Sequence, residues 1–240
     1  MNGPDVYVLV QRVHGAFEHV AATILPNRGD SRRVTARRPL SAQVSRLTPD
    51  FVRRSAHMAL PIVTARLEIR DFIPEDRSAL HEYASDPRVT QYLWWGPFSE
   101  IETLQFLERT GRDAKMPPRA NFELAVVDRE HGRVIGGCEF LSRRAIYQEY
   151  EIGYFFRPEA WGRGIATETV RALLGFGFRS IGAHRIYALV DPENTASQRL
   201  LARIGFRLEG HLRKDAFIRG EWRDSLVYAI LADEWPSDGS

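Results

Sequence analysis

The 240-residue chain has a single cysteine, Cys138, and no apolar run close to the roughly 18 residues that a membrane-spanning helix requires. One cysteine cannot form a disulfide within the chain, which agrees with a reducing compartment. Its place inside an apolar stretch favours a core residue over a nucleophile. These scarcities argue against a disulfide-stapled scaffold and a helical membrane protein. We therefore expect a cytoplasmic location and no membrane partner.

Metal-binding patterns are also missing. The seven histidines show no His-Glu-x-x-His or similar spacing, so the sequence predicts no metal site. There is no internal repeat and no low-complexity tract. The hydrophobic share of 44% and the charged share of 27% are those of an ordinary globular protein, so a folded core is expected.

Residues 1–57 are poor in acidic residues and carry a net positive charge, with nine arginines against four acidic residues, while the remainder of the chain carries a net charge of −3. We expect residues 1–57 to be a basic, poorly ordered extension and residues 58–240 to form the folded domain. Such a leader is also compatible with an organellar transit peptide or with an arm that touches nucleic acid. Met58 directly precedes the first regular strand pattern, so we hypothesise that translation begins there; abundant natural peptides upstream of Met58 in mass spectrometry would contradict this.

From Met58 onward the apolar periodicity predicts alternating helices and strands. Ser99 and Glu102 have the spacing of a capping box, and Asn194 and Gly205 are typical of a helix start and a helix end. Helices are expected over residues 74–85, 101–111, 166–178 and 195–204. Strands are expected over residues 66–70, 122–128, 133–141, 145–156, 184–190, 206–210 and 224–231, with a polar and aromatic segment over residues 213–223.

The central strands should form an antiparallel meander, because only the short turns His131-Gly132 and Ser142-Arg-Arg144 separate them. Gly175 and Gly177 interrupt the helix that follows. Each should cost about 1 kcal/mol relative to alanine, which indicates close packing against the sheet.

The stretch Trp161-Gly-Arg-Gly-Ile-Ala-Thr-Glu168 lies between the last meander strand and that helix. Two glycines one residue apart allow a tight turn, and a helix start adds free N–H donors and a positive dipole end. Together they suit a pyrophosphate. A Rossmann dinucleotide turn is the alternative, but Thr167 replaces its third glycine and the preceding strands are antiparallel.

Two patterns together resemble a known family. They are Arg157-Pro-Glu-Ala-Trp-Gly-Arg-Gly-Ile-Ala-Thr-Glu168 and Asn194-Thr-Ala-Ser-Gln-Arg-Leu-Leu-Ala-Arg-Ile-Gly-Phe206. They are similar to the acetyl-CoA motif and the following motif of the GNAT superfamily of N-acetyltransferases. Thr64-Ala-Arg-Leu-Glu-Ile-Arg70, Glu151-Ile-Gly-Tyr154 and Glu221-Trp-Arg-Asp224 resemble the branch of ribosomal-protein-alanine N-acetyltransferases. Trp161 departs from the Gln or Arg of the superfamily but is usual in this branch.

The resemblance implies an α+β fold, called α/β in some schemes, with a central mixed, mostly antiparallel sheet flanked by helices. It also implies a V-shaped gap between the strand that ends near Phe156 and the strand over residues 184–190. Acetyl-CoA would be the co-substrate, its pantetheine arm pairing with the free strand edge. The residues implied to bind it are Phe155, Phe156, Arg157, Trp161, Gly162, Arg163, Gly164, Ile165, Ala166, Thr167 and Asn194.

Two residues are candidates for the proton transfers of amine acetylation. Ser197 would lie near the sulfur, and Glu151 would take the proton of the amine, with Glu149 on the same strand face as the fallback. Each also has a structural interpretation, since Ser197 begins a helix and Glu151 can pair with an arginine. Trp94-Trp95 is expected to line the acceptor site, with packing on a helix as the alternative.

The leading hypothesis is an acetyl-CoA-dependent N-acetyltransferase that acts on a protein or peptide α-amine. A small-amine or aminoglycoside acetyltransferase of the same fold is the rival within enzymes. A CoA-binding module without turnover and a basic-armed nucleic-acid binder are the alternatives from other classes, the last disfavoured. The sequence leaves open whether the protein is a monomer or a homodimer.

Overall fold

The computed structural model describes residues 60–117 and 119–236. The predictions for residues 1–57 and for a domain start at Met58 lie outside the described residues. One eight-stranded sheet runs through this part in the order β1-β2-β3-β4-β5-β6-β8-β7. Its strands are β1 (Ile62–Val63), β2 (Leu67–Asp71), β3 (Asn121–Asp128), β4 (Arg133–Arg144), β5 (Glu149–Phe156), β6 (Arg185–Val190), β7 (Arg207–Ile218) and β8 (Glu221–Leu231).

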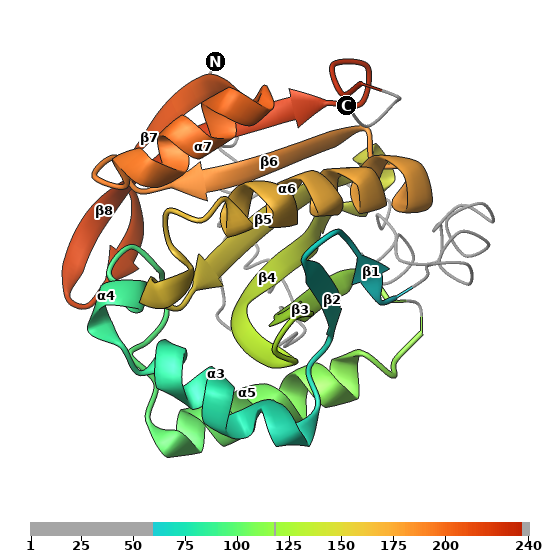
Figure 1. The fold of residues 1–240 in the computed structure, drawn as a ribbon. Helices are drawn as coiled ribbons and strands as arrows, with labels where there is room; N and C mark the ends of the chain where they lie inside the picture. The colour runs from blue at the N-terminus through green and yellow to red at the C-terminus, as the bar shows by residue number, and fades with distance from the viewer. Residues whose placement is uncertain (1–59, 118, 237–240) are drawn as a thin grey trace, which may run out of the picture. The chain divides into compact units, whose positions relative to one another are not determined.

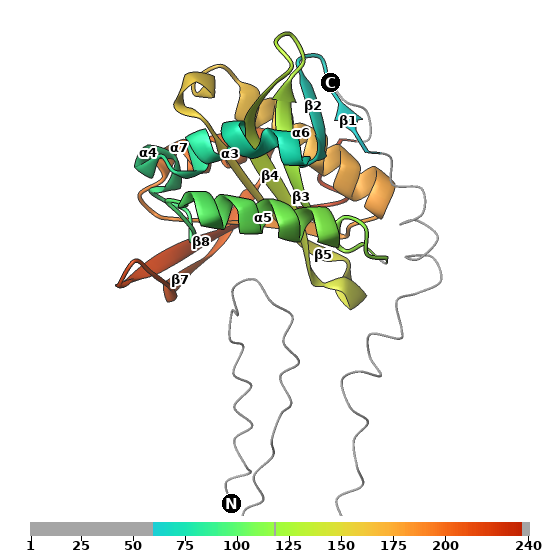
Figure 2. The ribbon, with the colours of Figure 1, turned by 90° about the horizontal axis from the view of Figure 1, so that it is seen from below.

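Helices cover both faces of the sheet (Figures 1 and 2). They are α3 (Arg77–Ala84), α4 (Pro87–Thr90), α5 (Glu100–Asp113), α6 (Ile165–Gly175) and α7 (Thr195–Ile204). Side chains of α6 and α7 join the larger core cluster on one face, and side chains of α3 and α5 join the smaller cluster on the other. No helix of the described part is both long and apolar enough to cross a bilayer.

Strand pairing is antiparallel everywhere except between β5 and β6, which run parallel. This confirms the mixed, mostly antiparallel sheet of an α+β fold. Each face alternates along a strand, so odd-numbered and even-numbered residues of β5 point to opposite helix layers. Phe155 accordingly belongs to the smaller cluster and Phe156 to the larger one.

Local capping chemistry behaves as the sequence predicts. The Ser99 Oγ accepts a hydrogen bond from the Glu102 N–H at 3.3 Å, and the Glu102 carboxylate accepts one from the Ser99 N–H at 2.7 Å. At the start of α7 the Asn194 Oδ1 accepts from the Ser197 N–H at 3.1 Å. Gly205 ends this helix with φ of +113°, a left-handed value that favours glycine.

The expected turn at residues 142–144 is wrong, because Arg143 and Arg144 continue β4. The chain turns one step later, through a short 3₁₀ turn (Ala145–Tyr147) and Gln148, whose φ is +52°. Residues 213–223 also differ from the expectation of a separate segment. They belong to the long hairpin of β7 and β8, which turns at Gly220.

The helix after the glycine turn is shorter than expected and passes into a π-helical turn (Phe176–Ile181). A Cβ on Gly177 would lie 2.6 Å from Ile186 Cδ1 and 2.7 Å from the Phe140 ring, so close packing is confirmed there. Gly175 has no other group within 4 Å of such a Cβ, so the same expectation is wrong for Gly175.

Candidate active site

The strands β5 and β6 separate after a short paired stretch. Their register pairs Glu149 with Arg185, Tyr150 with Ile186 and Glu151 with Tyr187, and it stops there. Residues 152–156 of β5 therefore present one edge without a strand neighbour. This confirms the V-shaped gap beside the strand that ends at Phe156. A free strand edge can pair with an extended, peptide-like chain.

The glycine turn follows the free edge. Gly162 and Gly164 have φ of +72° and +74°, left-handed values that favour glycine, and α6 starts at Ile165. The first residues of α6, including Ala166 and Thr167, have N–H groups that no intrahelical carbonyl can satisfy. Backbone geometry and helix start are thus suited to holding an anion.

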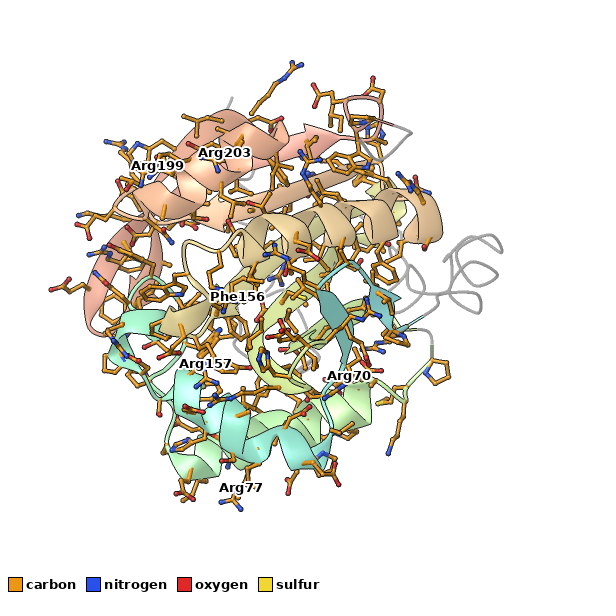
Figure 3. The ribbon with its side chains drawn as sticks, viewed as in Figure 1. Arg70, Arg77, Phe156, Arg157, Arg199 and Arg203 are labelled. Atoms are coloured by element: carbon orange, nitrogen blue, oxygen red, sulfur yellow. The ribbon has the colours of Figure 1, made fainter. Side chains whose placement is uncertain are left out.

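Trp161 is half exposed, and its indole Nε1–H donates to the Phe156 carbonyl at 2.8 Å. This bond holds the glycine turn against the end of β5. Phe156 and Arg157 lie at the end of β5 (Figure 3). The Arg157 N–H donates to the Ile135 carbonyl at 3.0 Å, so this amide is engaged within the sheet.

The Arg157 side chain is buried and forms ion pairs with Glu82 and Glu159. Its guanidinium thus ties β5 to α3. Arg163 is exposed at the tip of the turn, and its carbonyl accepts from Arg66 Nη1 at 2.9 Å.

Three contacts fasten the glycine turn to the segment between β1 and β2. The Glu168 carboxylate accepts from Thr64 Oγ1 at 2.6 Å, from the Arg66 N–H at 3.0 Å and from Arg66 Nε at 2.7 Å. Partial burial opposes the charge of Glu168, but these hydrogen bonds outweigh it and lower the pKa of the carboxyl. The sequence reasoning did not identify this set, which we call the latch (Thr64, Arg66 and Glu168).

Ser197 faces a hydroxyl partner that the sequence reasoning missed. The Tyr154 hydroxyl of β5 and the Ser197 Oγ of α7 lie 2.5 Å apart in a hydrogen bond. Burial raises the pKa of Tyr154 to about 12, against the lowering effect of the bond to Ser197. The pair lies on the α6 and α7 side of the sheet, at the free edge of β5.

Glu151 and Glu149 both have arginine partners. Glu151 accepts from Arg143 Nε at 2.8 Å and from the Tyr187 hydroxyl at 3.1 Å. Arg144 donates to both oxygens of Glu149, at 2.8 and 2.5 Å. Burial and the neighbouring Glu151 raise the pKa of Tyr187. The structural interpretation of these acids therefore applies, and it leaves their catalytic role a prediction.

Glu139 of β4 is a further acid that the sequence reasoning missed. It is only 8% exposed. Burial, followed by the charges of Glu123 and Glu151, raises the pKa of Glu139 to about 8. An acid inside the apolar run Val134-Ile-Gly-Gly-Cys-Glu-Phe140 was the signal that could have identified it.

Trp95 packs against Phe98 and Phe155, with ring centroids 4.7 and 4.9 Å apart, in the smaller core cluster. Trp95 thus follows the alternative of packing against the helix layer, and a role of this pair at the acceptor site stays a prediction. Trp94 is 45% exposed.

At the turn between β3 and β4, Asp128, Glu130 and His131 bring ligand-type atoms within 4.8 Å of one another, a grouping that the histidine spacing did not indicate. The Asp128 carboxylate accepts from the Glu130 N–H at 3.1 Å.

A divided sheet followed by a left-handed glycine turn at a helix start is the architecture that the resemblance implies for an N-acetyltransferase. A family model described as "Acetyltransferase (GNAT) domain" matches residues 66–207. The chain therefore belongs to the GNAT superfamily of N-acetyltransferases, enzymes that use acetyl-CoA.

Two similar proteins cover most of the described chain. The uncharacterized N-acetyltransferase YnaD of Bacillus subtilis is 37% identical over 175 residues, 72% of this chain and 98% of the relative. A crystal structure of a GNAT-family acetyltransferase from Bacillus anthracis has 35% identity and a TM-score of 0.63, over 72% of this chain and 98% of that one.

The relatives whose names state an acceptor have a lower sequence identity to this chain or match a smaller part of it. The ribosomal protein uS5-alanine N-acetyltransferase of Escherichia coli is 30% identical over 115 residues, 48% of this chain and 59% of the relative. The spermidine N(1)-acetyltransferase of Escherichia coli is 22% identical over 170 residues, 70% of this chain and 88% of the relative.

Proposed function

We propose that the protein transfers the acetyl group of acetyl-CoA to the α-amine of a protein or peptide by direct attack in a ternary complex. The observation that carries this proposal is that hydroxyl groups and carboxylates lie on opposite faces of β5. The hydroxyl groups of Tyr154 and Ser197 lie on one face at the free edge, and the carboxylates of Glu149 and Glu151 lie on the other face, where β5 still pairs with β6. Acetylation of an amine requires both kinds of group, one for the leaving thiolate and one for the ammonium proton.

The chain offers a backbone cradle for acetyl-CoA. Residues 152–156 provide a free edge for the pantetheine arm, with Phe155, Phe156 and Arg157 at its end. The amides from Trp161 to Thr167 would hold the pyrophosphate, because left-handed Gly162 and Gly164 turn the chain into a helix start. Asn194 caps α7 and so aims Ser197 at the same edge.

Much of the acceleration would come from holding the two substrates together, which is worth up to about 7–11 kcal/mol in well-oriented systems. In this scheme Ser197 serves the thiol side. Glu151 is the acid that the family pattern suggests for the amine side. Its contacts with Arg143 and Tyr187 would orient it.

A protein α-amine is favoured as the acceptor by the closing Glu221-Trp-Arg-Asp224 pattern and by the uS5-alanine relative. A small-amine or polyamine acceptor is the second candidate, which the spermidine relative supports. Polyamine sites need several uncompensated carboxylates, whereas the Glu149 and Glu151 carboxylates each have an arginine partner. This balance favours an acceptor with few charges.

Release of free thiol from acetyl-CoA tests the proposal. The panel should contain peptides that begin with alanine or serine, glycinamide, spermidine and an aminoglycoside. We expect turnover with the peptides to exceed turnover with spermidine by at least tenfold in kcat/KM. Preferential turnover of spermidine would show that the acceptor is a polyamine and not a protein α-amine. Tight acetyl-CoA binding in calorimetry without turnover of any amine would instead indicate a CoA-binding module.

A further inference from the structure

Three carboxylates lie on the same face of the sheet near its centre. We call Glu123 of β3, Glu139 of β4 and Glu151 of β5 the acidic cluster. In the sheet register Glu123 lies opposite Glu139, and Glu139 lies opposite Gly153. Like charges on directly opposed residues are destabilising. Tyr154, the next residue after Gly153, points to the other face.

Two members of the acidic cluster have their own counter-charges. Arg109 of α5 donates to both oxygens of Glu123, at 2.5 and 2.8 Å, and Arg143 donates to Glu151. Glu139 is different. Within residues 60–117 and 119–236 its carboxylate makes no hydrogen bond and no ion pair, although the residue is 92% buried. A buried carboxylate without a direct partner is costly, and such a group is more typical of a functional site than of a structural core.

Glu139 lies beside the free edge of β5. A Cβ on Gly153 would lie only 3.1 Å from Glu139 Oε2, so glycine keeps this side of the carboxylate clear of a side chain. Gly153 lies two residues beyond the last pair of β5 with β6, on the free edge. The carboxylate and the Tyr154 hydroxyl thus flank one short strand segment from opposite faces.

We propose, on the basis of the proposed function, that the Glu139 carboxylate binds the ammonium group of the acceptor and takes its first proton. One uncompensated carboxylate matches one ammonium. The acceptor class that follows is a primary amine with a single positive charge at the reacting end, such as a peptide N-terminus, and not a polyamine.

The two protons that the acceptor nitrogen loses leave on opposite faces of β5. The ammonium gives one proton to Glu139, which passes it to solvent. The free amine forms the N–C bond with the thioester carbonyl, the C–S bond breaks, and the sulfur leaves with the electron pair. The second proton lost by the nitrogen ends on that sulfur. The products are the amide, the thiol of CoA and one released proton.

This role gives a defined pH dependence. The charged and titratable groups around Glu139 are Glu123, Glu151, Arg109, Arg143 and, hydrogen-bonded to Glu151, Tyr187. Only the ionised Glu139 can bind an ammonium and accept its proton. Because burial and the like charges raise the pKa of Glu139 to about 8, kcat/KM for the amine should rise with pH through that region.

The test compares Glu139→Gln, Glu151→Gln and Glu123→Gln with wild type. The acceptors are an alanine-starting peptide and hydroxylamine, which is uncharged at neutral pH. We expect Glu139→Gln to lower kcat/KM for the peptide at least 100-fold and for hydroxylamine less than tenfold, with the Kd for acetyl-CoA unchanged within threefold. The acid limb of the pH profile should disappear in this variant. Glu123→Gln should move the limb to lower pH, because it removes a like charge and frees Arg109.

Contrary outcomes are distinct from one another. Normal peptide turnover by Glu139→Gln, with the loss falling on Glu151→Gln, would overturn the assignment to Glu139 and leave the proposed function intact. Equal losses for peptide and hydroxylamine would reduce Glu139 to a structural residue and overturn the proposal. A wild-type protein without turnover of any amine would overturn both the assignment and the proposed function.

Discussion

Tyr154 and Ser197 bring together two hydroxyl groups from elements 43 residues apart in the chain. Because burial raises the pKa of Tyr154 to about 12, its phenol keeps its proton at every ordinary assay pH. A phenol that stays protonated can donate to a departing thiolate, directly or through the Ser197 hydroxyl. We therefore expect the pair to act as one unit in the proposed reaction.

We predict that Tyr154→Phe and Ser197→Ala each lower kcat by about ten- to a hundredfold, the lower part of the usual range for general acid catalysis, because a thiolate is already a good leaving group. The KM for acetyl-CoA should change less than threefold. Steady-state thiol release measures both values. If the hydroxyls act as a unit, the double variant should lose no more than the worse single variant.

Tyr150→Phe is the matched control for Tyr154→Phe. Tyr150 lies on the same face of the same strand, is buried, and has a hydroxyl without a hydrogen-bond partner among the described residues. Its removal should leave kcat unchanged. An equal loss of kcat in Tyr150→Phe would show that both substitutions act through strand packing.

At the residue scale the sequence motif was sufficient to place Ser197 and Asn194, because capping depends on contacts three residues apart. Tyr154 and Glu139 could not be assigned in the same way. Their partners depend on strand register and on how α7 approaches β5, which local spacing does not encode. The acid inside an apolar strand was visible, but its neighbours were not.

The glycine turn is held by the latch, which joins the β1–β2 connection to the first turn of α6. Glu168 accepts from Thr64 and Arg66, and Arg66 also donates to the Arg163 carbonyl within the turn. The carboxylate is also favourably placed at a helix N-terminus. Elements 97 to 104 residues apart in the sequence thus fix the conformation of the loop that we propose binds the pyrophosphate.

Glu168→Ala should weaken acetyl-CoA binding about tenfold, because the turn loses the side chain that orders it before binding. Thermal stability should fall only slightly, since Arg66 is 49% exposed and exposed ion pairs contribute little. Calorimetric titration with acetyl-CoA gives the Kd. Glu100→Ala is the control, because Glu100 is also a first-turn acid paired with an arginine, Arg77, but on α5. Equal Kd values for the two variants would exclude an effect of the latch on acetyl-CoA binding.

Element boundaries were predictable where a local signal dominates. The capping box of α5 and the start of α7 are both at the expected residues. The turn after β4 was missed because Gln148 adopts the left-handed conformation that usually indicates glycine. The hairpin of β7 and β8 was underestimated because its polar, exposed residues lack alternation, and pairing between the two strands extends them.

At the scale of the whole molecule, the function that we propose for Glu139 conflicts with stability at the centre of the sheet. Glu139 lies 92% buried beside the like charges of Glu123 and Glu151, and the more distant charges of Arg143 and Arg109 offset its charge only in part. Natural proteins keep residues that destabilise the fold mainly at functional sites, and there the rule that a buried core is apolar does not hold. The composition, by contrast, indicated only an ordinary globular protein, because a single buried acid does not alter average quantities.

This conflict predicts a pH-dependent gain in stability from Glu139→Gln. The pKa of Glu139 rises from an ordinary 4.5 to about 8 on folding, so the folded state binds more protons between these values. Unfolding free energy contributed by this group therefore falls as pH rises from about 4.5 to 8. At about 1.4 kcal/mol per pKa unit the loss is on the order of a few kcal/mol. Glutamine cannot ionise, so thermal melts should show Glu139→Gln gaining stability over wild type between pH 5 and pH 9. A constant difference across this range would mean that Glu139 is charged throughout.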